Sequence, residues 1–207
     1  MKRIITLLLN LVIFKFCFAQ SQWSTSYNSN SNSGRIDDVN FVDEQTGFFG
    51  LNYFSNDIYK TVDGGNNWVK KISIPNYIRS IKFGSKSFGL CGLIRNTNSN
   101  IILLKTLDGG ETWQNIPDSI SYLDTAKKGI CGISIPDSNS CFLVGAWMSP
   151  AYFLKSLDQA NAWQYYDMSA YAKSLVDVFF INKNEGFAVG SCINTDEGFE
   201  YEKLIIH

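Results

Sequence analysis

The chain has 207 residues, 45% of them hydrophobic, and carries 18 basic and 19 acidic side chains for a formal net charge of −1. A hydrophobic fraction of that size is ordinary for a folded core and argues against a disordered chain. The near balance of charge argues against nucleic acid or an anionic membrane surface as the main partner. Aromatic residues reach 14%, with 16 Gly and only 4 Pro, which favours an all-β chain with tight turns.

The first 19 residues have the pattern of a secretory signal peptide. A basic start (Lys2, Arg3) precedes a mainly apolar run from Ile4 to Phe14, and Cys17 and Ala19 are small residues suited to cleavage after Ala19. The run is too short to span a bilayer, and no later stretch approaches the roughly 20 apolar residues that a spanning helix needs. The sequence predicts a signal peptide at residues 1–19 and a secreted or periplasmic protein without a membrane span. An uncleaved anchor is the alternative.

Four cysteines remain after the predicted cleavage site. An even number in an exported chain permits two disulfides, in three possible connectivities. Four small buried hydrophobic side chains are the alternative, because the spacing shows no tight disulfide framework. The sequence leaves this choice open for Cys91, Cys131, Cys141 and Cys192.

Residues 20–207 contain a repeat of about 45 residues, a period found in propeller and other repeat folds. Trp23, Trp68, Trp113 and Trp163 are spaced 45, 45 and 50 residues apart. The last three each end a similar eight-residue segment with an Asp at its third position. We call these segments the Asp turns: Thr61–Trp68, Thr106–Trp113 and Ser156–Trp163.

The segments between the Asp turns alternate apolar and polar residues as antiparallel strands do. Each unit starts with two strands joined by a polar turn, at Val39–Gly50, Ile81–Gly92, Ile133–Gly145 and Val178–Gly190. A third strand precedes each Asp turn, and a fourth begins at each Trp. The third strands are expected at Asp57–Thr61, Ile101–Thr106 and Tyr152–Ser156. Four strands in a unit of this length form the blade of a β-propeller.

The sequence therefore predicts an all-β protein, a β-propeller of four-stranded antiparallel blades with about four blades present and the ring incomplete. The last unit stops at His207, where a fourth Asp turn would begin, while Trp23 begins an outer strand without preceding partners. A closed four-bladed ring is conceivable, but we expect an open arc that associates through its unpaired edges. The shared register predicts blade core at Phe41, Phe83, Ile135 and Phe180.

The chemistry of the Asp turns is that of a tight connection between two strands. Gly after the Asp allows positive φ, the Asp carboxylate accepts backbone N–H bonds, and the leading Ser or Thr hydroxyl adds another such bond. The Trp buries a large ring between neighbouring blades. The predicted structural residues are Thr61, Asp63, Gly65, Trp68, Thr106, Asp108, Gly110, Thr112, Trp113, Ser156, Asp158 and Trp163.

These segments resemble the Asp-box, or bacterial neuraminidase repeat, Ser/Thr-x-Asp-x-Gly-x-Thr-Trp. Thr106–Trp113 matches every defined position, Thr61–Trp68 departs only at Asn67, and the third turn has Ala160 and Ala162 in place of Gly and Thr. Asp-boxes occur in sialidases, sortilin-type receptors, xyloglucanases and the photosystem II stability and assembly factor propellers. The hairpin phrases VNFVDEQTGFFG and VFFINKNEGFAVG look most like the last group. The resemblance implies a propeller whose Asp turns are structural and which assists the assembly or stability of another protein.

The sequence offers few of the residues that a catalytic site would need. The single histidine is His207, the last residue, which excludes a His-based catalytic triad, a His general base and a His metal site. The resemblance to sialidases would require three arginines gripping a carboxylate, and the chain after residue 19 has just Arg35, Arg79 and Arg95. The Asp residues of the Asp turns lie at equivalent places in successive blades, so they diverge instead of forming one site. We expect no enzyme activity, no cofactor and no metal.

A binding role is the better class, because a propeller offers a channel lined by the first strand of each blade. Aligned on the core positions, one register holds Asp37, Arg79, Cys131 and Val176, and the next holds Asp38, Ser80, Gly132 and Asp177. We predict a binding rim at Asp37, Asp38, Arg79 and Asp177. A protein is the expected partner, a glycan-binding or glycan-hydrolysing protein is the alternative, and an adhesin module anchored by a segment beyond His207 is a third hypothesis.

Overall fold

The computed structural model describes residues 34–53, 55–96, 98–116, 129–145, 150–192 and 203–207. The predicted signal peptide and Trp23 lie outside these ranges. Within them the chain forms strands and turns but no helix. The described segments therefore include no helix that could cross a membrane. The all-β class that the composition and the alternating pattern predict is confirmed.

The strands form four antiparallel sheets in chain order, which we number 1 to 4. Sheet 1 contains β1 (Arg35–Phe41), β2 (Gly47–Asn52), β3 (Asn56–Thr61) and β4 (Val69–Ile74). Sheet 2 contains β5 (Tyr77–Phe83), β6 (Gly89–Ile94), β7 (Leu103–Thr106) and β8 (Gln114–Asn115). Sheet 3 contains β9 (Ile130–Ser134), β10 (Cys141–Gly145), β11 (Tyr152–Ser156) and β12 (Gln164–Asp167). Sheet 4 contains β13 (Ser174–Asn182), β14 (Glu185–Ser191) and β15 (Lys203–Ile206).

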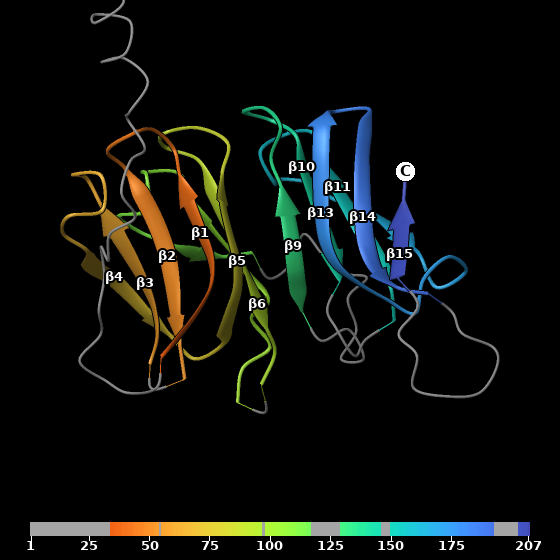
Figure 1. Ribbon diagram of the computed structural model, residues 1–207, viewed down its shortest axis with the longest axis horizontal. Coiled ribbons are helices and arrows are strands. Elements are labelled where there is room, and N and C mark those ends of the chain that lie inside the picture. Colours follow the sequence, from red (N-terminus) through yellow and green to blue (C-terminus); the bar gives the residue numbers. More distant parts are fainter. Residues whose placement is uncertain (1–33, 54, 97, 117–128, 146–149, 193–202) are drawn as a thin grey trace, which may run out of the picture.

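Each sheet is a simple meander, in which every strand pairs with the one before it. The fourth strands begin one residue after Trp68, Trp113 and Trp163, so each Trp closes its turn and the strand follows. The four sheets stand side by side in an open arc, with sheet 1 at one end and sheet 4 at the other (Figure 1). The first strands of sheets 2, 3 and 4 are β5, β9 and β13. Each of them packs on the first two strands of the sheet before it.

Three buried hydrophobic clusters join the neighbouring sheets. Phe48 and Ile58 of sheet 1 pack with Ile78 and Ile81 of sheet 2, and similar clusters lie between sheets 2 and 3 and between sheets 3 and 4. Aromatic stacking recurs at two of these interfaces, with ring centroids 4.0 Å apart for Phe48 and Phe83 and 3.6 Å apart for Phe142 and Phe180. The core therefore lies between the sheets, and inner strands such as β6 and β10 are buried on both faces.

The expectation that Phe41 is core is wrong. Its side chain is 44% exposed, although Phe83, Ile135 and Phe180 at the same register are partly buried against the clusters. These three residues pack on the sheet that precedes them in the chain. No described sheet precedes sheet 1, so the same position there faces outward.

The four cysteines of the described part form no disulfide. Cys91, Cys131 and Cys141 are buried, and Cys192 is half-buried. Burial raises the pKa of the Cys141 thiol to about 12, so that thiol stays protonated and behaves as a small hydrophobic side chain. The alternative of buried thiols, which the sequence left open, is therefore the observed one.

Candidate binding cavity at the inner strands

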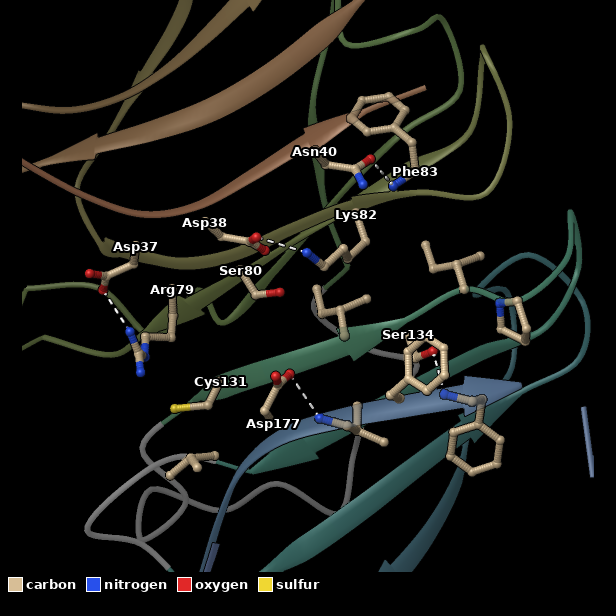
Figure 2. A pocket seen from close by; sticks show the side chains of 17 residues that line it. Asp37, Asp38, Asn40, Arg79, Ser80, Lys82, Phe83, Cys131, Ser134 and Asp177 are labelled. Atoms are coloured by element: carbon tan, nitrogen blue, oxygen red, sulfur yellow. Dashed lines mark hydrogen bonds and ion pairs between the residues drawn. The ribbon is translucent and has the colours of Figure 1, made fainter. Parts of the chain in front are cut away.

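The inner strands β1, β5, β9 and β13 surround a cavity of about 550 Å³. It is open to solvent and falls within the size range of ligand sites. Its lining includes Asp37, Asp38, Arg79 and Asp177, the four residues of the predicted rim (Figure 2). Residues at these two adjacent registers come together here because the first strand of each sheet turns the same edge toward the centre of the arc.

Charged pairs occupy one part of this lining. The Arg79 guanidinium donates to the Asp37 carboxylate at 2.8 Å, and Lys82 donates to Asp38 at 2.7 Å (Figure 2). Asp37 also accepts hydrogen bonds from the Tyr77 hydroxyl, at 2.8 Å, and from Arg35. Both pairs join β1 to β5, so they hold sheets 1 and 2 together at the cavity wall.

The pKa of Asp37 reflects these contacts. The side chain is only 3% exposed, and burial on its own raises the pKa of a carboxyl group. Hydrogen bonds from Tyr77, Arg79 and Arg35 outweigh burial and hold the pKa of Asp37 below its ordinary value. The carboxylate is therefore ionised and fully engaged at neutral pH, which suits a structural or binding group rather than a proton donor.

Asp177 differs from the other two carboxylates. It lies on β13, is exposed, and accepts one hydrogen bond from the backbone N–H of Val178 at 2.8 Å. Among the described residues it forms no ion pair. Since the lining has three carboxylates and two cationic side chains, Asp177 supplies a negative charge that remains available to a ligand.

The other part of the lining is apolar and was not predicted as a site from the sequence. Ile133, Ile135 and Pro136 from sheet 3 and Phe179 and Phe180 from sheet 4 contribute to it. Ser134 accepts the backbone N–H of Phe180 at 2.9 Å, and this bond fixes the two strands side by side. Alternation along β13 could have indicated Phe179, because residues 177 and 179 lie on the same face of that strand.

The cavity does not bring together the three arginines required by the sialidase hypothesis, because of the three it is Arg79 that lines it. Arg35 and Arg79 both bind Asp37. Arg95 follows β6 and does not belong to the cavity lining. Among the described residues, no group of three or more His, Cys, Asp or Glu side chains is placed to hold a metal ion.

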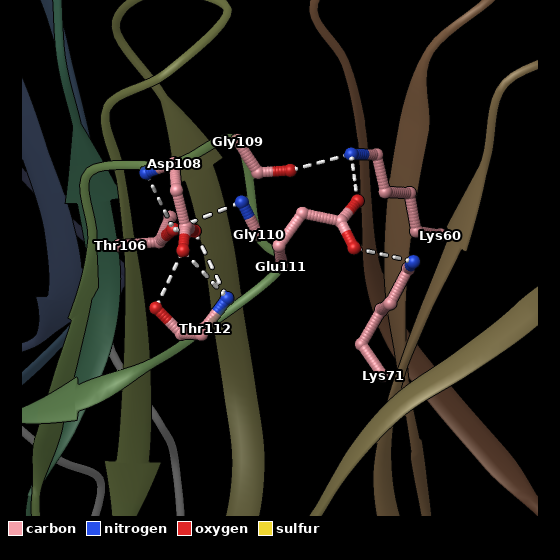
Figure 3. A network of polar contacts seen from close by, with 8 residues as sticks. All are labelled: Lys60, Lys71, Thr106, Asp108, Gly109, Gly110, Glu111 and Thr112. Atoms are coloured by element: carbon pink, nitrogen blue, oxygen red, sulfur yellow. Dashed lines mark hydrogen bonds and ion pairs between the residues drawn. The ribbon is translucent and has the colours of Figure 1, made fainter.

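The Asp turns lie between the third and fourth strands of sheets 1, 2 and 3, away from this lining. In the second turn the Thr106 hydroxyl donates to Asp108 at 2.8 Å and accepts the N–H of Gly110 at 2.8 Å. Asp108 in turn accepts the hydroxyl and backbone N–H of Thr112 (Figure 3). The side-chain bond from Thr112 and then its backbone bond lower the pKa of Asp108 to about 2.

The first and third turns repeat most of this arrangement. Asp63 accepts the Thr61 hydroxyl and the backbone N–H of Asn67. Asp158 accepts the Ser156 hydroxyl and the N–H of Ala162, but Ala162 has no hydroxyl to add. The three carboxylates sit on three separate turns.

The second and third Asp turns also bind the sheet before them. Lys60 of sheet 1 donates to the carbonyl of Gly109 at 2.8 Å and to Glu111 at 2.7 Å, and Lys71 donates to Glu111 at 2.8 Å (Figure 3). Lys105 of sheet 2 likewise donates to Asn161 of the third turn at 2.8 Å. The turns therefore fasten adjacent sheets together.

Comparison with known proteins gives a clear answer for the fold. No family model matches the chain, and no curated protein matches it in sequence. Solved structures do match: YCF48 bound to D1 peptide (TM-score 0.50, 16% identity, 75% of this chain and 60% of that chain) and YCF48 from Cyanidioschyzon merolae (0.55, 13%, 77% and 50%). A third is the Niastella koreensis GH74 enzyme (0.56, 17%, 81% and 31%).

The chain has the β-propeller fold. The four sheets are its blades, and the predicted class of an incomplete propeller with four-stranded antiparallel blades is confirmed. The chain covers less than two thirds of each of these neighbours. At identities of 17% or less the likeness shows the fold alone, and the neighbours include both YCF48 and a glycoside hydrolase.

A mutation in each of two Asp turns tests their structural role. Asp108→Ala is expected to lower the melting temperature by about 3–8 °C, because it removes the acceptor of the Thr112 N–H and hydroxyl groups. Asp158→Ala is expected to lower it less, since Asp158 accepts no hydroxyl at position 162. Thermal melts followed by circular dichroism measure both, and unchanged melting temperatures would contradict a structural role.

The Asp108 contribution has a definite pH dependence. Its pKa is about 2, below the ordinary value of 3.8. The stabilisation is therefore present above about pH 4 and is lost as the pH falls toward 2. The difference in melting temperature between wild type and Asp108→Ala should narrow over that range.

Proposed function

We propose that the protein is an exported, non-catalytic propeller that binds a segment of another protein in the inner-strand cavity and so assists that protein's assembly or stability. The observation that carries the proposal is an open cavity of about 550 Å³ with an apolar part and an available carboxylate, Asp177. An apolar surface beside a single negative charge suits a peptide segment that carries apolar side chains next to a Lys or Arg.

The neighbours support a protein partner in general terms. One of the propellers that this chain resembles is YCF48, whose structure contains D1 peptide. The hairpin phrases between the Asp turns resemble the assembly-factor propellers, which implies the same class of role. Export rests on the signal-peptide pattern of residues 1–19 and belongs to the proposal.

Hydrolysis of a glycan is the alternative, and the geometry favours it less. Glycoside hydrolysis usually requires a pair of carboxyl groups, of which one has a raised pKa and donates a proton. In the cavity the pKa of Asp37 is lowered instead, and Asp37 and Asp38 are held by Arg79 and Lys82. These pairs occupy the carboxylates that an acid–base mechanism would need.

An array of equal-length peptides that differ in Lys and Arg content tests the proposal. We expect the wild-type protein to bind peptides that combine Lys or Arg with apolar residues. Asp177→Asn keeps the size of the side chain and its acceptor for Val178, and it is expected to weaken binding of the selected peptides about fivefold, or about 1 kcal/mol. Glu44→Gln removes an equal charge outside the cavity and should leave binding unchanged.

Two results would count against the proposal. If Asp177→Asn, Glu44→Gln and wild type bound the selected peptides with equal affinity, the cavity would not be the peptide-binding site. Binding to a glycan array without any peptide binding would favour the glycan alternative.

A further inference from the structure

The inner strands meet at three seams around the cavity: β1 with β5, β5 with β9, and β9 with β13. We call them the first, middle and last seams. In an antiparallel sheet, alternate residues of an edge strand direct their backbone N–H groups away from the neighbouring strand. These N–H groups need acceptors from outside their own sheet. The three seams differ in whether the protein supplies one.

Side chains of the preceding inner strand supply the acceptor at the first and last seams. At the first seam, the amide oxygen of Asn40 accepts the N–H of Phe83 at 3.0 Å (Figure 2). At the last seam, the Ser134 hydroxyl oxygen accepts the N–H of Phe180 at 2.9 Å. We call such an oxygen a cap, because it satisfies an edge N–H of the next blade.

The middle seam lacks this cap. Lys82 holds the position of Asn40 and Ser134 in the strand register. A lysine ammonium group cannot accept a hydrogen bond, and Lys82 donates back to Asp38 at 2.7 Å instead. Among the described residues, no acceptor lies within hydrogen-bond distance of the N–H of Ile135, which has the register of the two capped residues. Ile135 is half-buried and lines the cavity.

The hydroxyl of Ser80 on β5 is a second unpartnered group at the middle seam. Ser80 is only 3% exposed and lines the cavity, and Figure 2 shows its oxygen directed into the space between β5 and β9. It forms no hydrogen bond within the described part of the chain, although Asp38, at the aligned position one blade earlier, accepts the N–H of Ile81 at 3.0 Å. Buried hydroxyl groups usually have a partner, so Ser80 offers a donor to a ligand.

The spacing of the two donors matches an extended peptide. Asp38 and Asn40 cap residues 81 and 83, two positions apart. By the same register Ser80 lies beside Ile133, so its hydroxyl and the N–H of Ile135 are offset by two residues along the seam. An extended peptide directs every second main-chain carbonyl to the same edge, with the same two-residue period.

Charge favours a neutral acceptor at this place. The cavity lining has three carboxylates and two cationic side chains, so an added carboxylate would meet a negative surface. An amide carbonyl is uncharged and accepts from either an O–H or an N–H group. The flanking seams use the same chemistry, since neutral oxygens of Asn40 and Ser134 serve as caps there.

We propose that a bound peptide lies extended along the middle seam, where main-chain carbonyls of alternate residues accept the Ser80 hydroxyl and the Ile135 N–H. These carbonyls do for the middle seam what Asn40 and Ser134 do for its neighbours. The inference rests on the proposed peptide binding, and it adds the peptide main chain as a point of contact to the basic side chain expected at Asp177.

Variants of the two seam positions test the proposal with the peptides selected on the array. Ser80→Ala is expected to weaken their binding about fivefold. Lys82→Asn gives the middle seam the cap that Asn40 gives the first, and Lys82→Ala is its control, because both changes remove the bond to Asp38. We expect Lys82→Asn to bind peptides about fivefold more weakly than Lys82→Ala. It should also melt at a higher temperature, since the Ile135 N–H gains an acceptor.

Backbone esters in the peptide locate the carbonyls, because an ester carbonyl is a weaker acceptor than an amide carbonyl. Single ester replacements are expected to weaken binding to wild type at two positions that are two residues apart. The loss at one of these positions should disappear in Ser80→Ala, as coupled partners require. Replacing Asn or Gln side chains of the peptide by Leu should leave binding unchanged.

The outcomes separate this inference from the proposed function. If wild type binds no peptide, both fail. If Asp177→Asn weakens binding but Ser80→Ala does not, and Lys82→Asn binds and melts as Lys82→Ala does, solvent alone occupies the seam and only this inference is overturned. Sensitivity to the peptide's Asn or Gln side chains, without sensitivity to esters, would overturn the assignment to the main chain.

Discussion

Asn52→Leu is expected to destabilise the fold by about 2–5 kcal/mol, the largest effect of a single polar residue that we anticipate. Asn52 is fully buried at the end of β2. Its amide donates to the carbonyl of Ile78 at 2.9 Å and its oxygen accepts the N–H of Ile78 at 2.7 Å. Leu has a similar size but leaves both backbone groups of Ile78 without these partners in a buried interface. Urea denaturation measures the loss.

Asn52→Asp separates the hydrogen bonds from side-chain size. An ionised Asp still accepts the Ile78 N–H, but it faces the Ile78 carbonyl without a proton to donate and carries a buried charge. Burial raises the pKa of such a carboxyl in the folded state above its unfolded value of about 3.9. The variant is therefore expected to approach wild-type stability as the pH falls toward 4 and to lose stability as the pH rises. A stability difference from wild type that does not change with pH would contradict this account.

Gly110→Ala is expected to destabilise the fold by about 2–5 kcal/mol through two effects. Gly110 has φ of 77°, where a side chain is unfavourable for L-residues. A Cβ at this position would lie 2.5 Å from the Phe48 ring. Phe48 would have to move, and its stacking on Phe83 across the blade interface would be disturbed.

The third Asp turn supplies the control. Ala160 holds the position of Gly110, with φ of 61°, and is buried in the cluster between sheets 2 and 3 to which Leu90 also belongs. Leu90 is the residue of sheet 2 that corresponds to Phe48. Where the turn has Ala instead of Gly, the preceding blade thus has the smaller Leu instead of Phe. Ala160→Gly is expected to stay within about 1 kcal/mol of wild type, because relief of the positive φ offsets the lost methyl burial.

A double mutant checks the packing effect directly. Phe48→Leu reproduces in the first interface the pair found in the second, so Phe48→Leu with Gly110→Ala should be less destabilised than the sum of the single changes. Strict additivity in denaturant unfolding would show that the backbone conformation at Gly110, and not the contact with Phe48, accounts for the cost.

Local sequence was sufficient to predict the repeat units and the register of the residues that line the cavity. The spacing of Trp68, Trp113 and Trp163 and the period-two alternation set the strands, because both depend on residues close in the chain. Aligning the first strands placed Asp37, Asp38, Arg79 and Asp177 in two adjacent registers, and all four line the cavity. Their binding role is a proposal.

Only the tertiary structure decided which faces are covered and which charges are paired. Phe41 has the sequence environment of Phe83, but its exposure depends on whether a blade precedes it, which no local pattern records. The bonds of Asn52 to Ile78 and of Lys60 to Glu111 join residues 26 and 51 positions apart. Contacts of that kind follow from how the blades are rotated against each other, so they appear only when the sheets are packed.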